Sequence, residues 1–245
     1  MSDRFPSPAL PLFPPDDARI RVVGSFEGLV STRFADGVNA LCWRRELAGD
    51  FGEVVRLLNC GDGITPLDEE TLVALPVGAA GRMAIDTMLA DLERLEDAGL
   101  EPSLDCIRGY RRDVSTSPVS TDVFSFHVDS ATAEADTYLC TYHGPSSEGL
   151  RNEDARRRVD VPETRAALRE LYGDAKLDAD FVAYLTTHHY DLHYVPARPE
   201  VKPYVFGVGN LWRIATQYPG SPVPPCIHRA PETRPGDEAR LLLIS

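Results

Sequence analysis

The sequence has little cysteine, few basic residues and no long apolar run. The five cysteines form no C-x-x-C pair, which argues against a disulfide framework or a cysteine-rich zinc module. Basic residues number 25 against 38 acidic ones, giving a formal net charge of −13, and such a surface repels a phosphate backbone. We therefore expect no nucleic-acid partner.

No stretch approaches the roughly 18 apolar residues of a membrane span, and early prolines interrupt any signal sequence. We therefore expect a cytoplasmic protein without a membrane partner.

The remaining composition is that of a folded globular protein. Hydrophobic residues make up 43% of the 245 positions and charged residues 26%, which is enough to form a sizeable core. Five prolines in residues 1–18 predict an extended N-terminal arm, because proline at that density supports neither a helix nor a central strand. We expect residues 19–245 to form a single domain. No sequence signal specifies an oligomeric state.

One helix is predicted from its apolar spacing. Ile85, Met88, Leu92 and Leu95 recur at intervals of three and four, the opposite face is charged, and Gly99 follows as a C-terminal cap. Its apolar stripe is expected to cover a sheet. The charged segment 44–50 can start another helix.

The rest of the chain is dominated by short strand-like runs, which predict a mainly β fold with flanking helices. Two further helices, at about 162–172 and 178–189, are expected within a helical insertion at about 148–195. The predicted strands are residues 19–23, 38–43, 123–128, 137–142, 204–208, 211–216, 226–229 and 239–244.

The segment Phe126-His127-Val128-Asp129 is the most informative local pattern. Residues two apart in a strand share a face, so His127 and Asp129 would point together. Such a pair alone is more typical of a hydrogen-bonded histidine than of a metal site, and a third ligand is required. His228 is the candidate, because a distant second histidine completes a 2-His-1-carboxylate triad that holds Fe(II) and leaves open positions. Taken alone, His228 is more typical of a hydrogen-bonded histidine near a strand end than of a metal ligand.

Arg240 is the fourth notable residue. It precedes the apolar run Leu241 to Ile244, where a buried charge is costly unless an anion meets it. A guanidinium suits bidentate binding of a carboxylate.

His127, Asp129, His228 and Arg240, in that order, resemble the pattern of the Fe(II)/2-oxoglutarate-dependent oxygenases. The segments FHVDSATAEADTYLCTYHGP and CIHRAPETRPGDEARLLLIS are also similar to a family of bacterial proteins of unknown function. The resemblance implies a double-stranded β-helix, the cupin-like jelly roll, with helices packed on one sheet. It implies that His127, Asp129 and His228 bind iron and that Arg240 pairs with the distal carboxylate of 2-oxoglutarate. Many members of the superfamily place a hydroxyl two residues after this arginine, where this chain has Leu242.

The function expected from this resemblance is that of a non-haem Fe(II)- and 2-oxoglutarate-dependent dioxygenase. It would consume O2, form succinate and CO2, and oxidise a small-molecule substrate, with hydroxylation as the expected outcome. Two alternatives stay open: a non-catalytic cupin-like metal-binding or sensing protein, and a zinc hydrolase, which would need a general base that the sequence does not identify.

Secondary candidates have simpler interpretations. Tyr138 and Tyr142 share a strand face, and Tyr142 is included as a possible ligand of a bound carboxylate, although tyrosines of the core or its rim fit as well. Partly exposed histidines explain His188, His189 and His193 better than a second metal site does. Asn210, Trp212 and Arg213 could face a substrate, although a core role is the simpler interpretation of Trp212. Cys226 is best interpreted as a packed thiol, and Arg156 to Arg158 as a solvated face.

Overall fold

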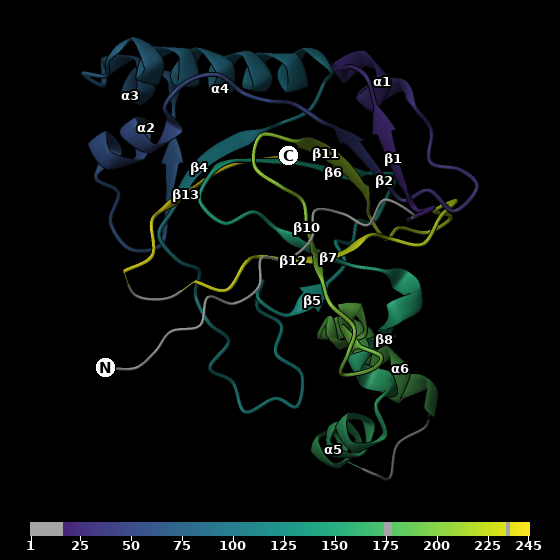
Figure 1. Cartoon of the computed structure of the whole chain (residues 1–245). Helices are drawn as coiled ribbons and strands as arrows, with labels where there is room; N and C mark the ends of the chain where they lie inside the picture. The colour runs from purple at the N-terminus through teal and green to yellow at the C-terminus, as the bar shows by residue number, and fades with distance from the viewer. Residues whose placement is uncertain (1–16, 174–177, 234–235) are drawn as a thin grey trace.

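The computed structural model describes residues 17–173, 178–233 and 236–245. The predicted arm at residues 1–18 lies almost wholly outside these ranges. The described chain is mainly β, with two curled sheets and flanking helices (Figure 1), which confirms the predicted class at this level. No helix among the described residues is both long and apolar enough to cross a bilayer.

The larger sheet has seven strands, all antiparallel except for the parallel pair β1 and β2. In spatial order the strands are β1 (Ile20–Val23), β2 (Ala40–Trp43), β11 (Leu211–Ala215), β6 (Asp136–His143), β13 (Arg240–Ile244), β4 (Ser103–Ile107) and β3 (Ile64–Leu67).

The smaller sheet has six short antiparallel strands. In spatial order they are β10 (Tyr204–Val205), β7 (Glu148–Leu150), β12 (Ile227–Arg229), β5 (Phe126–His127), β9 (His193–Pro196) and β8 (Ala155–Arg157).

Helices cover the face of the larger sheet that points away from the smaller one (Figure 1). These helices are α1 (Phe26–Ser31), α2 (Phe51–Leu58), α3 (Glu69–Ala74) and α4 (Ala79–Asp97). The apolar stripe of α4 packs on the sheet, as predicted. Residues 44–50 are not helical, because the N-cap of α2 is Asp50, whose carboxylate accepts from the backbone N–H of Glu53.

The insertion is less helical than predicted. It contains α5 (Pro162–Tyr172) and α6 (Asp178–Thr187), close to the predicted bounds, which pack on each other beside the smaller sheet. The same stretch also includes strands β7, β8 and β9 and three short 3-10 turns, at Asn152–Asp154, Arg158–Asp160 and Tyr190–Leu192. Because β7 pairs with β12 inside the smaller sheet, the region 148–195 is part of the β framework and not a separate helical unit.

Strand β13 separates two cores. Its side chains alternate, so that Leu241 and Leu243 pack with the helices while Leu242 joins the core between the two sheets. Arg240 shares the face of Leu242 and lies opposite Ile107, another residue of the intersheet core. The guanidinium of Arg240 is therefore directed into the space between the sheets.

Candidate metal centre

Three side chains that are far apart in the sequence converge in the smaller sheet. Strand β12 pairs with β5 so that His228 lies directly opposite His127, and the two ring centroids are 4.6 Å apart. Asp129 follows β5, with its oxygens 4.0 Å from Nε2 of His127 and 3.7 Å from Nε2 of His228. One ligand atom from each residue lies within 4.8 Å of the other two. The structure thus brings together the three predicted ligands, and the group can hold a metal ion.

Hydrogen bonds orient each of the three ligands. Nδ1 of His127 lies 2.8 Å from the carbonyl of Ser125, and Nδ1 of His228 lies 3.3 Å from the carbonyl of Cys226. A carbonyl only accepts, so the hydrogen of each neutral ring belongs on Nδ1 and the lone pair on Nε2 is free for a metal. Oδ2 of Asp129 accepts a 2.5 Å hydrogen bond from the hydroxyl of Thr137. Because Thr137 is on β6, this bond connects the site to the larger sheet.

The protonation states also favour metal binding. Burial lowers the pKa of His127 to about 4, with a further contribution from His228, so its ring is neutral at pH 7. Burial alone would raise the pKa of Asp129, but His228, the Thr137 hydroxyl and His127 outweigh it and lower this pKa. A neutral imidazole and an ionised carboxylate are the forms that ligate metals.

His193 is a neighbour of the site that the sequence did not reveal. Strand β9 places it opposite His127 on the side away from His228, so three histidines form one row across three adjacent strands. Its ring centroid lies 5.8 Å from that of His127, and its side chain is buried. Burial lowers its pKa to about 4, and its Nδ1 has no hydrogen-bond partner among the described residues.

Histidine exposure was therefore predicted correctly at two positions and wrongly at one. His188 and His189 are exposed and lie beyond α6, whereas His193 is 5% exposed. Strand β9 was not predicted. The burial of His193 depends on the pairing of β9 with β5, and the sequence around His193 contains no local pattern that distinguishes a buried histidine from an exposed one. The missing signal is the register between β9 and β5.

Arg240 is 2% exposed, and its hydrogen-bond partners among the described residues are all hydroxyls. Nη1 donates to Tyr110 at 3.1 Å, and Nη2 donates to Thr141 at 3.0 Å and to Ser147 at 2.7 Å. Within the described ranges, Nε has no hydrogen-bond partner and no carboxylate forms an ion pair with this guanidinium. Burial lowers the pKa of Arg240. The resemblance leads us to expect a hydroxyl two residues after the arginine, where this chain has Leu242. The three hydroxyls that contact Arg240 come from other positions.

Tyr142 is not part of this site. It lies on the helix-facing side of β6, where its ring stacks on Phe51 and its hydroxyl donates to Asp91 of α4 at 2.7 Å. Asp91 is fully buried and also accepts from Arg45 at 2.7 Å and from Arg94 at 2.8 Å. Tyr142 thus ties α4 to the sheet, and its predicted role in binding a carboxylate ligand does not fit this position. Tyr138 belongs to the same helix-side core.

The remaining secondary candidates have structural contacts. Cys226 is buried in the intersheet core beside the Tyr204 hydroxyl, and burial raises the pKa of its thiol to about 12, which fits a packed thiol. Trp212 is buried and donates to the carbonyl of Phe206 at 2.9 Å, as a core residue does. Asn210 donates to the same carbonyl. Arg213 pairs with Asp136 and caps carbonyls at the end of α1, and Arg157 pairs with Asp160.

No family model, no curated protein and no solved structure matches this chain.

Proposed function

We propose that the protein is a non-haem Fe(II)- and 2-oxoglutarate-dependent dioxygenase that oxidises, by hydroxylation, a small molecule. The observation that carries the proposal is Arg240, a buried guanidinium without a carboxylate partner among the described residues, directed into the space between the sheets. A buried charge of this kind is costly unless an anion compensates it. The triad borders the same space, because Asp129 is held by Thr137 from the inner face of β6 and Cys226, two residues before His228, belongs to the intersheet core.

Strand order supports a double-stranded β-helix. The central strands of the larger sheet run β11-β6-β13-β4, and those of the smaller run β10-β7-β12-β5, with every neighbouring pair antiparallel. Along the chain, β4, β6, β11 and β13 of the first sheet are interleaved with β5, β7, β10 and β12 of the second. Two four-stranded antiparallel sheets connected in this way are the arrangement that the proposed fold requires.

The donor set favours iron. Two imidazole nitrogens and one carboxylate on one side of a metal, with other positions open, are typical of mononuclear non-haem Fe(II) sites. Bound Fe(II), 2-oxoglutarate and O2 would together supply the oxidising chemistry, with release of succinate and CO2. The protein holds the ligands: Ser125 and Cys226 fix the histidine tautomers, and Thr137 fixes the carboxylate.

Arg240 and its hydroxyl neighbours would hold the distal carboxylate of 2-oxoglutarate. The guanidinium supplies charge, and the hydroxyls of Tyr110, Thr141 and Ser147, which accept from it, keep their own hydrogens available for an anion. Such a charge-assisted group is worth about 1.5–3 kcal/mol per good contact. This arrangement would replace the hydroxyl that is absent at Leu242.

The decisive experiment uses the anaerobic protein with Fe(II) and 2-oxoglutarate. We expect a weak visible charge-transfer band and, after admission of O2, stoichiometric succinate. His127→Ala should abolish iron binding and both signals while leaving the far-UV circular dichroism unchanged, because the fold does not depend on this side chain. A wild-type protein that binds Fe(II) but gives neither band nor succinate contradicts the proposal. Retention of zinc instead of iron after metal-free purification and reloading would favour the hydrolase.

One observation favours the second candidate, a metal-binding or sensing protein without turnover. Nη1 and Nη2 of Arg240 already donate to three hydroxyls, so this side chain is largely hydrogen-bonded without any ligand. Isothermal titration of the protein with Fe(II), in the presence and absence of 2-oxoglutarate, separates the two candidates. A metal-binding protein would bind Fe(II) with the same affinity in both titrations, whereas a dioxygenase would bind Fe(II) more tightly with 2-oxoglutarate present.

A further inference from the structure

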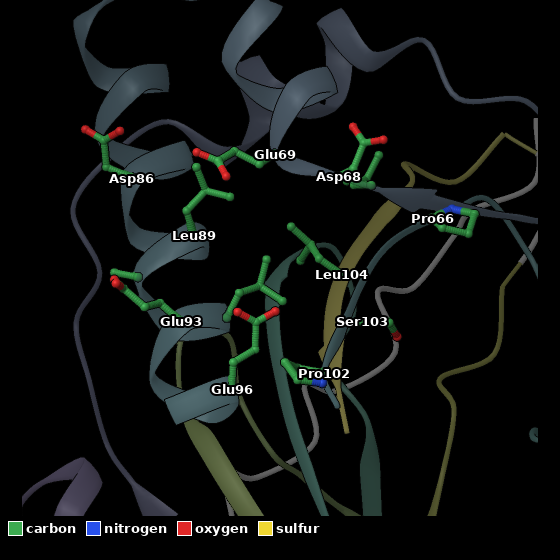
Figure 2. A pocket seen from close by; sticks show the side chains of 13 residues that line it. Pro66, Asp68, Glu69, Asp86, Leu89, Glu93, Glu96, Pro102, Ser103 and Leu104 are labelled. Carbon is green, nitrogen blue, oxygen red and sulfur yellow. The ribbon is translucent and has the colours of Figure 1, made fainter. Parts of the chain in front are cut away.

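A groove of about 770 Å3 lies on the helix-covered side of the molecule, far along the chain from the metal ligands. One wall is α4 and the other is formed by the end of β3, the start of α3 and the start of β4 (Figure 2). Leucines line its floor, with Leu89 and Leu92 half-buried on α4 and Leu104 buried on β4. The groove is thus apolar at its base.

Its rim is acidic on both sides. Asp86, Glu93 and Glu96 extend from α4, and Asp68 and Glu69 extend from the opposite wall, with the leucines between them (Figure 2). All five acidic residues are exposed, and none forms an ion pair with another described residue. No lysine, arginine or histidine lines the groove.

The absence of compensating cations distinguishes this groove from two other hollows that are lined by carboxylates. A hollow of about 610 Å3 beside β11 pairs its two carboxylates with two arginines: Glu134, Asp136, Arg33 and Arg213 line it together. A hollow of about 330 Å3 beside α5 likewise combines Asp160 and Asp191 with Arg157 and Arg165. In the groove along α4 the carboxylates face one another across an apolar floor. Asp68 accepts from the backbone N–H of Thr71 as the N-cap of α3, but no basic side chain lines the groove, so a cation from outside would relieve the repulsion among the carboxylates.

We propose that this groove binds an extended, arginine- or lysine-rich segment of a partner protein. From Asp86 to Glu96 the helix α4 advances about 15 Å, which an extended chain covers with about five residues. Successive side chains of an extended chain point to opposite sides, so consecutive basic residues would reach the carboxylates of both walls alternately. A helix lying in the groove would instead direct most of its basic side chains away from one wall.

The leucine floor selects long cationic side chains over small cations. Arginine and lysine lay their methylene stems on apolar surface while the charged head remains at the rim. Leu89 and Leu104 would contact the stems, and the heads would meet Asp86, Glu93 and Glu69. A metal ion or a compact amine would gain the charge interaction only.

The test measures fluorescence anisotropy of a labelled pentaarginine with the full-length protein at ~150 mM salt, where long-range attraction is screened beyond about 8 Å. The triple variant Asp86→Asn/Glu93→Gln/Glu96→Gln removes the carboxylates of one wall. We expect its dissociation constant to rise about tenfold or more, since exposed ion pairs contribute modestly but three are lost together. Ala90→Arg, which places a cation in the groove itself, should abolish binding. Circular dichroism and thermal melting identify any variant that fails to fold.

A matched control separates the groove from the overall negative charge. Glu134→Gln/Glu163→Gln/Glu170→Gln changes the net charge by the same three units at exposed positions outside the groove, and we expect less than about a threefold effect. Equal weakening by the two triple variants, or no binding of pentaarginine to the wild type, would overturn the proposal. So would equal binding of a penta-diaminobutyrate peptide, which keeps the charges on shorter stems, or preferential binding of spermine, which would indicate a small polyamine ligand.

Discussion

Two arginines with buried side chains, on opposite sides of the larger sheet, differ in the groups that compensate their charge. Arg45 lies on the helix side, where Asp91 accepts from it at 2.7 Å and the carboxylate is fully buried. Burial alone would lower the pKa of Arg45, but the hydrogen bond and charge of Asp91 outweigh it and raise this pKa. Arg240 lies on the intersheet side, where its partners in the described part of the chain are three hydroxyls, and burial lowers its pKa.

We interpret Arg45 as a structural charge and Arg240, under the proposed function, as a charge that a ligand would neutralise. The network around Asp91 joins α4 to the sheet through Arg45, Arg94 and Tyr142, and is complete without a ligand. The environment of Arg240 lacks an anion among the described residues. Buried charges without a partner are retained where a ligand supplies the partner, and the predictions below test this interpretation in order of decreasing effect.

The largest effect is expected from removing the buried carboxylate of Asp91. Asp91→Asn leaves Arg45 buried without a counter-charge, and breaking a buried pair in this way costs about 3–5 kcal/mol of unfolding free energy. The matched change Arg240→Met removes three hydrogen bonds but also relieves the cost of burying a charge without a described counter-charge, so we expect a smaller net loss, of about 1 kcal/mol. Urea unfolding of both variants measures the contrast. A loss at Arg240→Met as large as that at Asp91→Asn would show that Arg240 is structural.

A smaller effect is expected from pH in the metal-free protein. The pKa values of His127 and His193 are lowered to about 4 from an unfolded value of about 6.5. Between these values the unfolded chain binds protons that the folded chain does not, so stability falls as the pH falls from about 6.5 to 4, by up to about 3 kcal/mol per histidine.

Urea unfolding in the presence of a chelator, at several pH values in this window, measures the slope. His193→Gln should reduce the slope by about one proton, because one of the two buried rings is gone. An unchanged slope would mean that His193 remains protonated in the folded state, in conflict with its burial.

Next in size is the effect of Arg240 on co-substrate binding. Arg240→Ala should raise the apparent dissociation constant for 2-oxoglutarate about ten- to hundredfold, because the charge-assisted contacts are worth about 1.5–3 kcal/mol. Arg240→Lys should recover part of this loss, since the charge remains while the planar fork is lost. Fe(II) affinity should be nearly unchanged in both variants. Anaerobic titration with 2-oxoglutarate, followed by the visible band, measures the dissociation constant of the co-substrate. A parallel titration with Fe(II) measures the dissociation constant of the metal.

Much of the framework could be predicted from the sequence, because its signals are local. The spacing of Ile85, Met88 and Leu95 predicted α4, and short runs of apolar, aromatic and β-branched residues predicted β6, β11 and β13. The short helices α1 and α3 and the strands β3, β4, β7, β8 and β9 were not predicted. Elements of three to six residues carry too few positions for a period to emerge, and their structure depends on the neighbours they pair with.

The candidate site divides in the same way. His127, Asp129 and His228 could be predicted because their residue types and order are informative, whereas the partners of Arg240 could not. Tyr110 comes from a loop, and Ser147 precedes β7, so neither has a periodic pattern. Tyr142 was assigned to the wrong face because the sequence does not reveal which side of a strand packs on helices.

The smallest effect is expected at Thr137, which orients the carboxylate of Asp129 in the candidate metal centre from the opposite sheet. Thr137→Val keeps the shape and removes the hydroxyl that donates to Oδ2 of Asp129, and loss of such an orienting contact costs about tenfold in metal affinity. Thr137→Ser should retain most of the affinity, because the donor is kept. Competition with a coloured chelator measures the metal affinity of the wild type and of both variants. Equal affinities for the wild type and Thr137→Val would mean that Asp129 is positioned by its backbone alone, and the connection between the two sheets at the metal site would then have no functional role.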